Sequence, residues 1–297
     1  MTSAIFEAET VGVAMAGPFR NPVNESRAAL GSIHDDATAQ KLGFRGGTVA
    51  GNIHFEQFPP LAIAQLGEDW RKTGTLSLHF MSPTTDGEPV RALVGEAADL
   101  EGSGGLRKAP AWMETPEGVR VCEGSVSVGG SDPDSELRRR LKAVRPASDL
   151  RMLQASTVGD TCKAIPARID SEKALKRLEG VTESLPEYRD ASIFGACVAA
   201  PAVAIDLLRV VEGPLFKTDR VGPYVGMFGA IELEFIDGPI FLDHDYLADG
   251  VLLALSESPK TEVAWYESVV HDAADGRAVA RLIMMTRLLK ASSPLWA

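Results

Sequence analysis

The sequence predicts an α+β protein in which one unit, an apolar helix followed by antiparallel strands, occurs twice. Two apolar segments rich in small residues, 49–66 and 192–211, have the composition of buried helices. Segments that alternate apolar and polar residues follow each of them, and such alternation is typical of strands that bury one face. The 297 residues also suffice for two domains of ordinary size. We therefore expect two antiparallel sheets, each wrapped around a helix.

The first unit combines the helix predicted at residues 49–66 with about four strands. Pro59 and Pro60 should end or kink the helix, because proline lacks an N–H group and its ring clashes with the preceding turn. Ahead of it we expect a short helix near residues 25–30. The alternating pattern predicts strands near residues 75–81, 90–94, 106–113 and 119–128.

The second unit repeats this order. Its predicted helix contains Pro201. The segments LSLHFMSP, from Leu76, and IELEFIDGP, from Ile231, share two alternating apolar residues, a phenylalanine and a nearby proline, which is a weak internal repeat. The strands predicted in this unit are residues 231–236, 251–256, 263–271 and 278–289.

A basic cluster lies in the linker that we predict between the two units. We place the N-terminal domain at residues 1–130, the linker at 131–148 and the C-terminal domain at 149–297. The cluster allows two interpretations, a solvated linker helix or a patch that contacts the phosphates of a nucleotide-containing cofactor. Its members are Arg138, Arg139, Arg140 and Lys142.

Composition and missing motifs exclude several classes of function. The net charge of −11 opposes nucleic-acid binding, because a phosphate backbone would be repelled. Every apolar run is shorter than the ~20 residues that span a bilayer, and acidic residues precede the first one, so we expect a cytoplasmic protein. The sequence lacks paired cysteines, zinc-ligand spacing, a Walker motif and a GxSxG motif, so we expect neither metal nor cofactor.

Residues 32–66 pass from a polar segment through glycines into the predicted helix, an order that indicates a polar site beside a buried helix. His34 precedes Asp35 and Asp36, and imidazole titrates near neutral pH. Gly51, at the helix start, would leave its N–H group open to a ligand carbonyl. Structural roles remain alternatives: the glycines would turn the chain, His34 would bind a loop, and the two aspartates would be solvated.

The motif residues of the first unit resemble the MaoC-like family of acyl-CoA hydratases and dehydratases, which has a double hotdog fold. The resemblance covers residues 32–95 in detail and the remainder only as architecture. It implies a hydro-lyase that acts on an acyl-CoA or related thioester. The matching residues are His34 with Asp36, Gly43 with Phe44, Gly51, and then Leu76, Phe80, Pro83 and Gly87.

Two positions depart from the family pattern. The family's catalytic carboxylate lies five residues before the histidine, where this chain has Ala29. The histidine of the family's His-Gly pair is replaced by Ala50. The second unit has no histidine in or before its helix and resembles the degenerate copy that, in double hotdog proteins, makes room for a bulky acyl chain.

We therefore assign candidate roles to seven residues. His34 would be the catalytic base, with Asp36 or Asp35 as its partner, and Gly51 would donate its N–H group to the enolate oxygen, aided by Asn52. His54 and Glu56 would line the substrate pocket, although His54 is also explained as a core histidine.

Three functions follow from these roles. The first is hydration or dehydration of a bulky or unusual 2-enoyl or 3-hydroxyacyl thioester. The second is thioester hydrolysis, with Glu56 activating water. The third is a non-catalytic accessory subunit that binds an acyl group. Sheet edges also make a homodimer reasonable.

Overall fold

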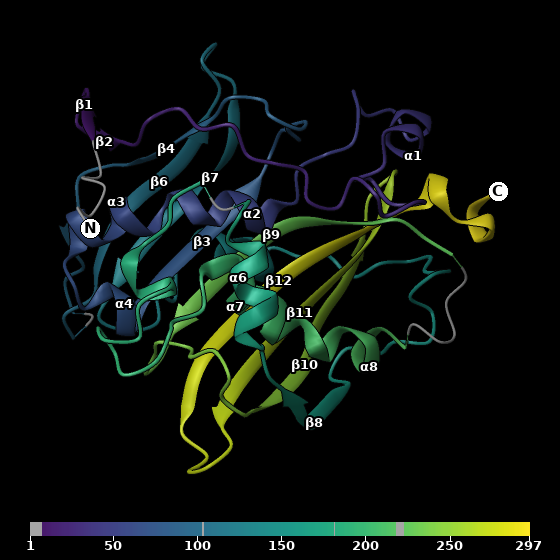
Figure 1. Ribbon diagram of the computed structural model, residues 1–297. Coiled ribbons are helices and arrows are strands. Elements are labelled where there is room, and N and C mark those ends of the chain that lie inside the picture. The colour runs from purple at the N-terminus through teal and green to yellow at the C-terminus, as the bar shows by residue number, and fades with distance from the viewer. Residues whose placement is uncertain (1–7, 103, 181, 218–222) are drawn as a thin grey trace.

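The computed structural model describes residues 8–102, 104–180, 182–217 and 223–297. Its strands form one antiparallel sheet in the order β1-β2-β4-β6-β7-β3-β9-β12-β11-β10-β8, with β5 joined to β6 (Figure 1). The strands are β1 (Glu9–Val11), β2 (Ala14–Ala16), β3 (Gly74–Phe80), β4 (Arg91–Val94), β5 (Ala98–Asp99), β6 (Arg107–Glu114), β7 (Arg120–Val128), β8 (Thr161–Ala167), β9 (Gly226–Phe235), β10 (Tyr246–Glu257), β11 (Thr261–Asp272) and β12 (Ala278–Leu289).

The two halves of the chain join at β3 and β9, which pair in the middle of the sheet. The register places Leu76 opposite Leu233 and Leu78 opposite Ile231, and all four side chains are buried. The two copies of the internal repeat therefore lie side by side, because each supplies one central strand. The two predicted sheets are continuous with each other through this pair.

The helices include three consecutive helical segments where the sequence predicts one helix at residues 49–66. Pro59 and Pro60 lie in the first turn of the third segment, so the predicted interruption is confirmed. The helices are α1 (Asp36–Lys41), α2 (Gly51–His54), η1 (Phe55–Gln57), α3 (Pro59–Leu66), α4 (Trp70–Thr73), α5 (Glu136–Lys142), α6 (Ser171–Arg177), η2 (Pro186–Tyr188), α7 (Pro201–Leu208), η3 (Arg209–Val211), α8 (Glu212–Phe216), η5 (Lys290–Ser292) and η6 (Pro294–Trp296).

The main core lies between the sheet and the helices that cover one of its faces. Phe55 and Phe58 from the first half and Ile205 from α7 belong to the same buried cluster as Leu78 and Ile231 of the central strands. In Figure 1, α2, α3 and α7 lie in front of the sheet. Small residues in both helical segments allow this close packing, so the chemistry of the core agrees with the sequence prediction.

Several predicted elements need correction. Residues 25–30 form turns and no helix. The second apolar helix begins at Pro201, and residues 192–200 before it form turns and a β-bridge from Val198 to Phe241. Proline is favoured at the first helical position because its missing N–H group needs no partner there. The edge strand β8 escapes prediction because its residues show no alternating burial and include Pro166.

The basic cluster of the predicted linker forms much of α5, on the opposite face of the sheet. Leu137 is buried there against Ala230 and Ile283. Each of the four cations pairs with a carboxylate, which favours the linker-helix interpretation over a phosphate patch: Arg138 with Glu232 and Glu234, Arg139 and Arg140 with Glu136, and Lys142 with Asp134.

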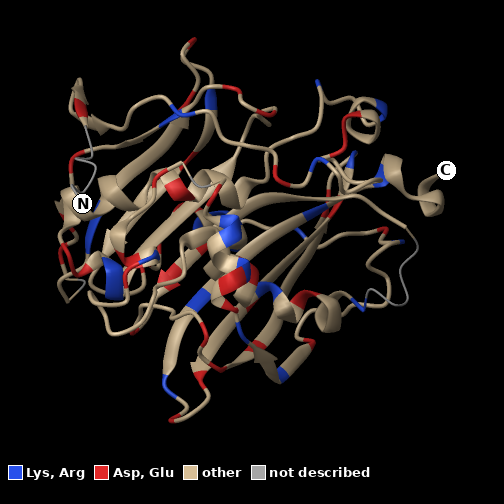
Figure 2. Ribbon diagram, viewed as in Figure 1, with Lys and Arg blue, Asp and Glu red and all other residues tan. Residues whose placement is uncertain are grey.

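Two features of the whole molecule bear on its partners. Basic and acidic residues are interspersed along the ribbon (Figure 2). Among the described residues, none of the helices has the length and apolar character that crossing a bilayer requires.

Candidate active site

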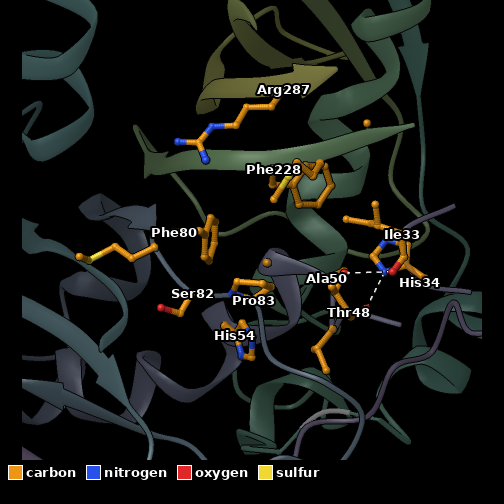
Figure 3. A pocket seen from close by; sticks show the side chains of 15 residues that line it. Ile33, His34, Thr48, Ala50, His54, Phe80, Ser82, Pro83, Phe228 and Arg287 are labelled. Atoms are coloured by element: carbon orange, nitrogen blue, oxygen red, sulfur yellow. Dashed lines mark hydrogen bonds between the residues drawn. The ribbon is translucent and has the colours of Figure 1, made fainter. Parts of the chain in front are cut away.

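His34 is held by hydrogen bonds to two other parts of the chain. Its ring Nδ1 is 2.7 Å from the Thr48 carbonyl oxygen (Figure 3). The Asn24 side chain donates to the His34 carbonyl at 2.8 Å. Because a carbonyl oxygen only accepts, Nδ1 carries the proton of the neutral ring, and Nε2 keeps a lone pair. Nε2 has no hydrogen-bond partner in the described part of the chain, so it is available to a ligand.

Asp35 and Asp36 do not orient this ring, which corrects the expected pairing. Asp35 caps the start of α1, where its carboxylate accepts from the backbone of Ala37 and Thr38 and from the Thr38 hydroxyl. Asp36 accepts from the Gly47 N–H group at 2.7 Å. Asp and Ser are favoured at such caps because their short side chains reach unpaired N–H groups. The two carboxylates therefore shape the loop that carries His34.

Gly47 is required where the two ends of this loop meet. A Cβ atom at position 47 would overlap the carbonyl oxygen of His34. The Thr48 N–H group next to it donates to the Ile33 carbonyl at 2.9 Å. The glycine therefore allows the segment before α2 to lie against the His34 backbone, and this contact places the Thr48 carbonyl within reach of the ring.

The start of α2 lies beside His34. Ala50 is its N-cap and offers no side-chain hydrogen bond. The backbone N–H groups of Gly51 and Asn52 make no hydrogen bond to another described residue. The first N–H groups of a helix carry partial positive charge and can bind an oxyanion. These two groups are therefore available as donors close to the imidazole.

His34, Ala50 and Gly51 line one cavity of about 90 Å³, as their order in the sequence predicts. The cavity opens where the pairing of β3 with β9 ends, at His79 and Ala230. Beyond this pair the two strands carry Phe80 and Phe228, whose rings also line the cavity (Figure 3). The site therefore lies at the junction of the two halves, and both contribute to its walls.

Gly51 is also constrained by packing, because a Cβ atom there would lie 2.7 Å from Cζ of Phe80. We expect Gly51→Ala to displace the Phe80 ring and to lower the free energy of unfolding by about 1–3 kcal/mol, measured by urea denaturation. Gly226→Ala is the matched control: Gly226 lines the same cavity, and its Cβ would meet no atom closer than 3.7 Å. Equal losses in both variants would contradict the steric argument.

A larger cavity of about 690 Å³ adjoins the small one, because both are lined by His34, Ala50, Gly226, Met227 and Phe228. Asp206 of α7 lies in its wall, paired with Arg177 at 2.7 Å, and accepts from the Asn52 amide at 3.3 Å. Burial raises the pKa of Asp206, and the two neighbouring arginines oppose this shift.

Sequence reasoning did not identify this polar wall. A signal was nevertheless present, because Asp206 is the one charged residue within the apolar segment PAVAIDLL. Arg209, three residues later, also lines the larger cavity, and its guanidinium pairs with Asp206 at 3.4 Å. A charge at helical spacing on a buried helix indicates that one helix face borders a polar space.

His54 and Glu56 are both buried, but only His54 lines one of the two cavities. His54 lines the small cavity, its Nε2 lies 2.9 Å from the Thr84 hydroxyl, and burial lowers its pKa to about 4. Its buried Nδ1 has no partner among the described residues. Glu56 borders neither the small nor the large cavity. Its carboxyl oxygen accepts from the Ala202 N–H group at 2.6 Å, at the start of α7, and burial raises its pKa to about 8.

The predicted set of residues is therefore brought together only in part. His34, Gly51 and His54 share the small cavity, and Asn52 lines the larger one. The described residues contain no group of three or more histidine, cysteine and acidic side chains arranged to hold a metal ion. Acid–base chemistry at His34, with backbone donors for an oxyanion, is the chemistry that these side chains can perform.

Comparison with known proteins gives results for structure alone. No family model matches the sequence, and no curated protein matches it. A Chloroflexus aurantiacus protein described as a MaoC domain protein dehydratase has a TM-score of 0.66 and 13% identity, covering 96% of each chain. A Mycobacterium tuberculosis protein, described as having a double hotdog fold, has a TM-score of 0.61 and 12% identity, covering 94% of this chain and 96% of that one.

A third structure, named as a MaoC-like dehydratase, has a TM-score of 0.54 and 15% identity, covering 93% of this chain and 98% of that one. These likenesses extend over nearly the whole chain. Because the sequence identities are only 12–15%, they support a conclusion about the fold alone. The resemblance inferred from residues 32–95 is therefore confirmed in its architecture, and the protein has the α+β double hotdog fold that MaoC-like dehydratases have.

Proposed function

We propose that this protein is a hydro-lyase of the MaoC-like type, which interconverts a 2-enoyl thioester and its 3-hydroxyacyl form. One observation carries the proposal: the open Nε2 of His34 and the free N–H groups at the start of α2 lie beside the same cavities. Enoyl hydration needs a base for water and donors for the developing enolate oxygen, and these groups supply both. The MaoC-like dehydratases of similar fold support the same reaction class.

In the hydration direction, His34 Nε2 takes a proton from water as the water oxygen bonds to C3. The electron pair of the double bond then moves to C2 and the thioester oxygen, where the N–H groups of Gly51 and Asn52 stabilise the negative charge. The imidazolium returns its proton to C2. Dehydration follows these steps in reverse, so one imidazole serves as base and acid.

The single-base scheme follows from the residues that this chain lacks. Ala29 has no proton to give, and neither Asp35 nor Asp36 contacts the His34 ring. The Thr48 carbonyl fixes the tautomer of His34, as a carboxylate does in other acid–base pairs. It cannot compensate an imidazolium charge as a carboxylate would, so we expect a slower reaction than a His–Asp pair would give.

The substrate would be an acyl-CoA or related thioester. His34 lines both a cavity of about 90 Å³ and a larger one of about 690 Å³. We propose that the reacting end of the acyl group enters the small cavity, while the thioester arm occupies the large one. The bulky or unusual acyl group expected from the sequence remains part of this proposal.

The proposal is tested by incubating the protein with a panel of enoyl, 3-hydroxyacyl and saturated acyl thioesters. Enoyl absorbance reports hydration, and free thiol reports hydrolysis. We expect a change in enoyl absorbance without thiol release. Thiol release alone would establish a thioesterase. No change in either enoyl absorbance or free thiol would favour the accessory acyl-binding subunit.

The thioesterase alternative would need a base other than the one expected from the sequence. Glu56 is fully buried and holds the start of α7, so its carboxyl group is not open to a water molecule beside the thioester. No second candidate function is favoured by a particular contact.

We also propose a cytoplasmic location and a homodimer, both from the sequence arguments above. The end strands of the sheet, β1 and β8, each leave one edge unpaired among the described strands. Such edges allow a second chain to associate. Sedimentation equilibrium of the purified protein tests the dimer, and a monomer at all concentrations would contradict it.

A further inference from the structure

Arg287, on β12, supplies a positive charge that no acidic group among the described residues balances. Its side chain lines the small cavity, and no aspartate or glutamate lines this cavity with it. Within the described part of the chain, its guanidinium forms no ion pair. Other half-buried arginines behave differently: Arg138, Arg209 and Arg281 each pair with a glutamate. Arg120 is also half-buried without an ion pair among the described residues, but its guanidinium lies over the Trp112 ring, 4.9 Å from the centroid. Within the described part of the chain, the Arg287 guanidinium has neither a carboxylate nor the face of an aromatic ring as its partner.

An enclosed cation without a counter-ion is energetically unfavourable, because it loses solvation and gains no opposite charge in return. Burial lowers the pKa of Arg287, and the nearby charge of Arg140 acts in the same direction. A structural role would be better served by a neutral side chain of the same length. An anionic ligand bound to the guanidinium would supply the missing opposite charge and offset the lost solvation.

The guanidinium is also held in position by the fold. Arg287 Nη2 lies 3.3 Å from Nε2 of His79 on β3. Arginine only donates, so His79 accepts this hydrogen bond as a neutral ring, and burial lowers the His79 pKa to about 4. The Arg287 side chain passes over Gly229 of β9, where a Cβ atom would lie 2.8 Å from Nε. His79 of β3 therefore orients the guanidinium, and Gly229 of β9 leaves room for it.

We infer that Arg287 binds a carboxylate at the end of the acyl group opposite the thioester, so that the substrate is the thioester of a short dicarboxylic acid. The inference rests on the proposed function, because His34 and Gly51 place the reacting carbons in the same cavity. Phe80 and Phe228 line the same cavity as Arg287 and His34, and in Figure 3 the Phe228 ring lies between the two, so the wall that joins them is apolar and suits a carbon chain. The planar guanidinium can hold a carboxylate through two parallel hydrogen bonds.

A phosphate of coenzyme A offers the same anionic oxygens, so the experiment must separate the two sources. Thioesters of N-acetylcysteamine carry no phosphate. We therefore choose N-acetylcysteamine thioesters of short trans-2-enedioic acids, each paired with its terminal amide, which has the same shape without the charge. Hydration is followed by enoyl absorbance for the wild type, Arg287→Gln and Arg287→Lys. Arg139→Gln is the control, because Arg139 is an exposed arginine of α5 outside the cavity.

We expect the wild type to prefer the acid over the amide by about 10- to 100-fold in kcat/KM, the worth of a charged hydrogen bond. Arg287→Gln should lose this preference, with a much larger fall in kcat/KM on the acid than on the amide. Arg287→Lys should retain part of the preference, and Arg139→Gln all of it. Equal rates of the wild type on acid and amide would overturn the inference. So would an effect of Arg287→Gln that appears only with coenzyme A thioesters and is independent of the acyl terminus.

A binding measurement separates this inference from the proposed reaction. Saturated thioether analogues that end in a carboxylate or an amide can neither be hydrated nor hydrolysed, and isothermal titration gives their affinities. If the wild type binds the carboxylate analogue more tightly and Arg287→Gln does not, the anion site is supported even when no hydration activity is detected. Hydration of neutral enoyl thioesters without a preference for the carboxylate would support the proposed reaction and contradict the carboxylate site at Arg287. A thermal midpoint of Arg287→Gln at or above that of the wild type would show that the variant is folded.

Discussion

Replacing His34 with alanine should lower kcat/KM for hydration by about 10²- to 10⁴-fold, the range that general acid–base catalysis contributes. The proposed scheme uses His34 Nε2 both to take the proton from water and to return it to C2, so the variant loses both proton transfers. His34→Gln should lose a similar factor, because an amide cannot exchange a proton near neutral pH. Initial rates with the best substrate of the thioester panel give the measurement.

Stability must be followed alongside activity in these variants. The lost hydrogen bond to Thr48 should cost about 1 kcal/mol of unfolding free energy, far less than would unfold the protein. His271→Ala is the matched control, since His271 lies on β11 near Asp249 and does not border either cavity around His34. Full hydration activity in folded His34→Ala would remove this residue from the mechanism.

Replacing Glu56 with glutamine should abolish a pH dependence of stability. Burial raises the Glu56 pKa to about 8, so the carboxyl group is protonated in the folded chain at neutral pH and ionised in the unfolded chain above its ordinary value of 4.5. The folded state therefore binds one more proton than the unfolded state between these values. Unfolding free energy should fall by about 1.4 kcal/mol per pH unit as the pH rises through this window.

Glutamine keeps the oxygen that accepts from the Ala202 N–H group and carries no charge at any pH. Urea denaturation from about pH 5 to pH 9 should therefore show a flatter profile for Glu56→Gln, with the greatest gain in stability above pH 8. Glu257→Gln is the control, because hydrogen bonds from Lys290 and Ser148 lower the Glu257 pKa to about 2. The stability from that shift is present above pH 4.5 and lost as the pH falls toward 2, so the control should keep the wild-type slope above pH 5. Parallel slopes for wild type and Glu56→Gln would show that Glu56 is ionised in the folded protein.

The local residues of the candidate site were predictable from sequence, and their partners were not. The order of His34, the glycines and Gly51 along the chain indicated a polar site beside a helix start, and all these residues are close in sequence. The partner of the imidazole is the Thr48 carbonyl, whereas the sequence suggested Asp35 or Asp36. Adjacent residues of a turn point in different directions, so neighbours in sequence need not be neighbours in space.

More distant partners could not be predicted at all. Glu56 binds the N–H group of Ala202, 146 residues further along the chain, and Arg287 meets His79 across 208 residues. The first contact depends on how α7 packs against the first half, and the second on the register of β3, β9 and β12. A sequence pattern shows which face of a strand is apolar. It does not show which strand lies beside it.

The sequence by itself determined the double helix-and-sheet architecture and the candidate imidazole at position 34, because periodic burial and glycine placement are local properties of the chain. The tertiary structure alone decided that the cavity forms where β3 and β9 separate and that Arg287 lines it without a counter-ion among the described residues. The reason is physical. Contacts across the junction arise from the packing of two halves whose residues lie far apart in sequence, and local periodicity carries no information about that packing.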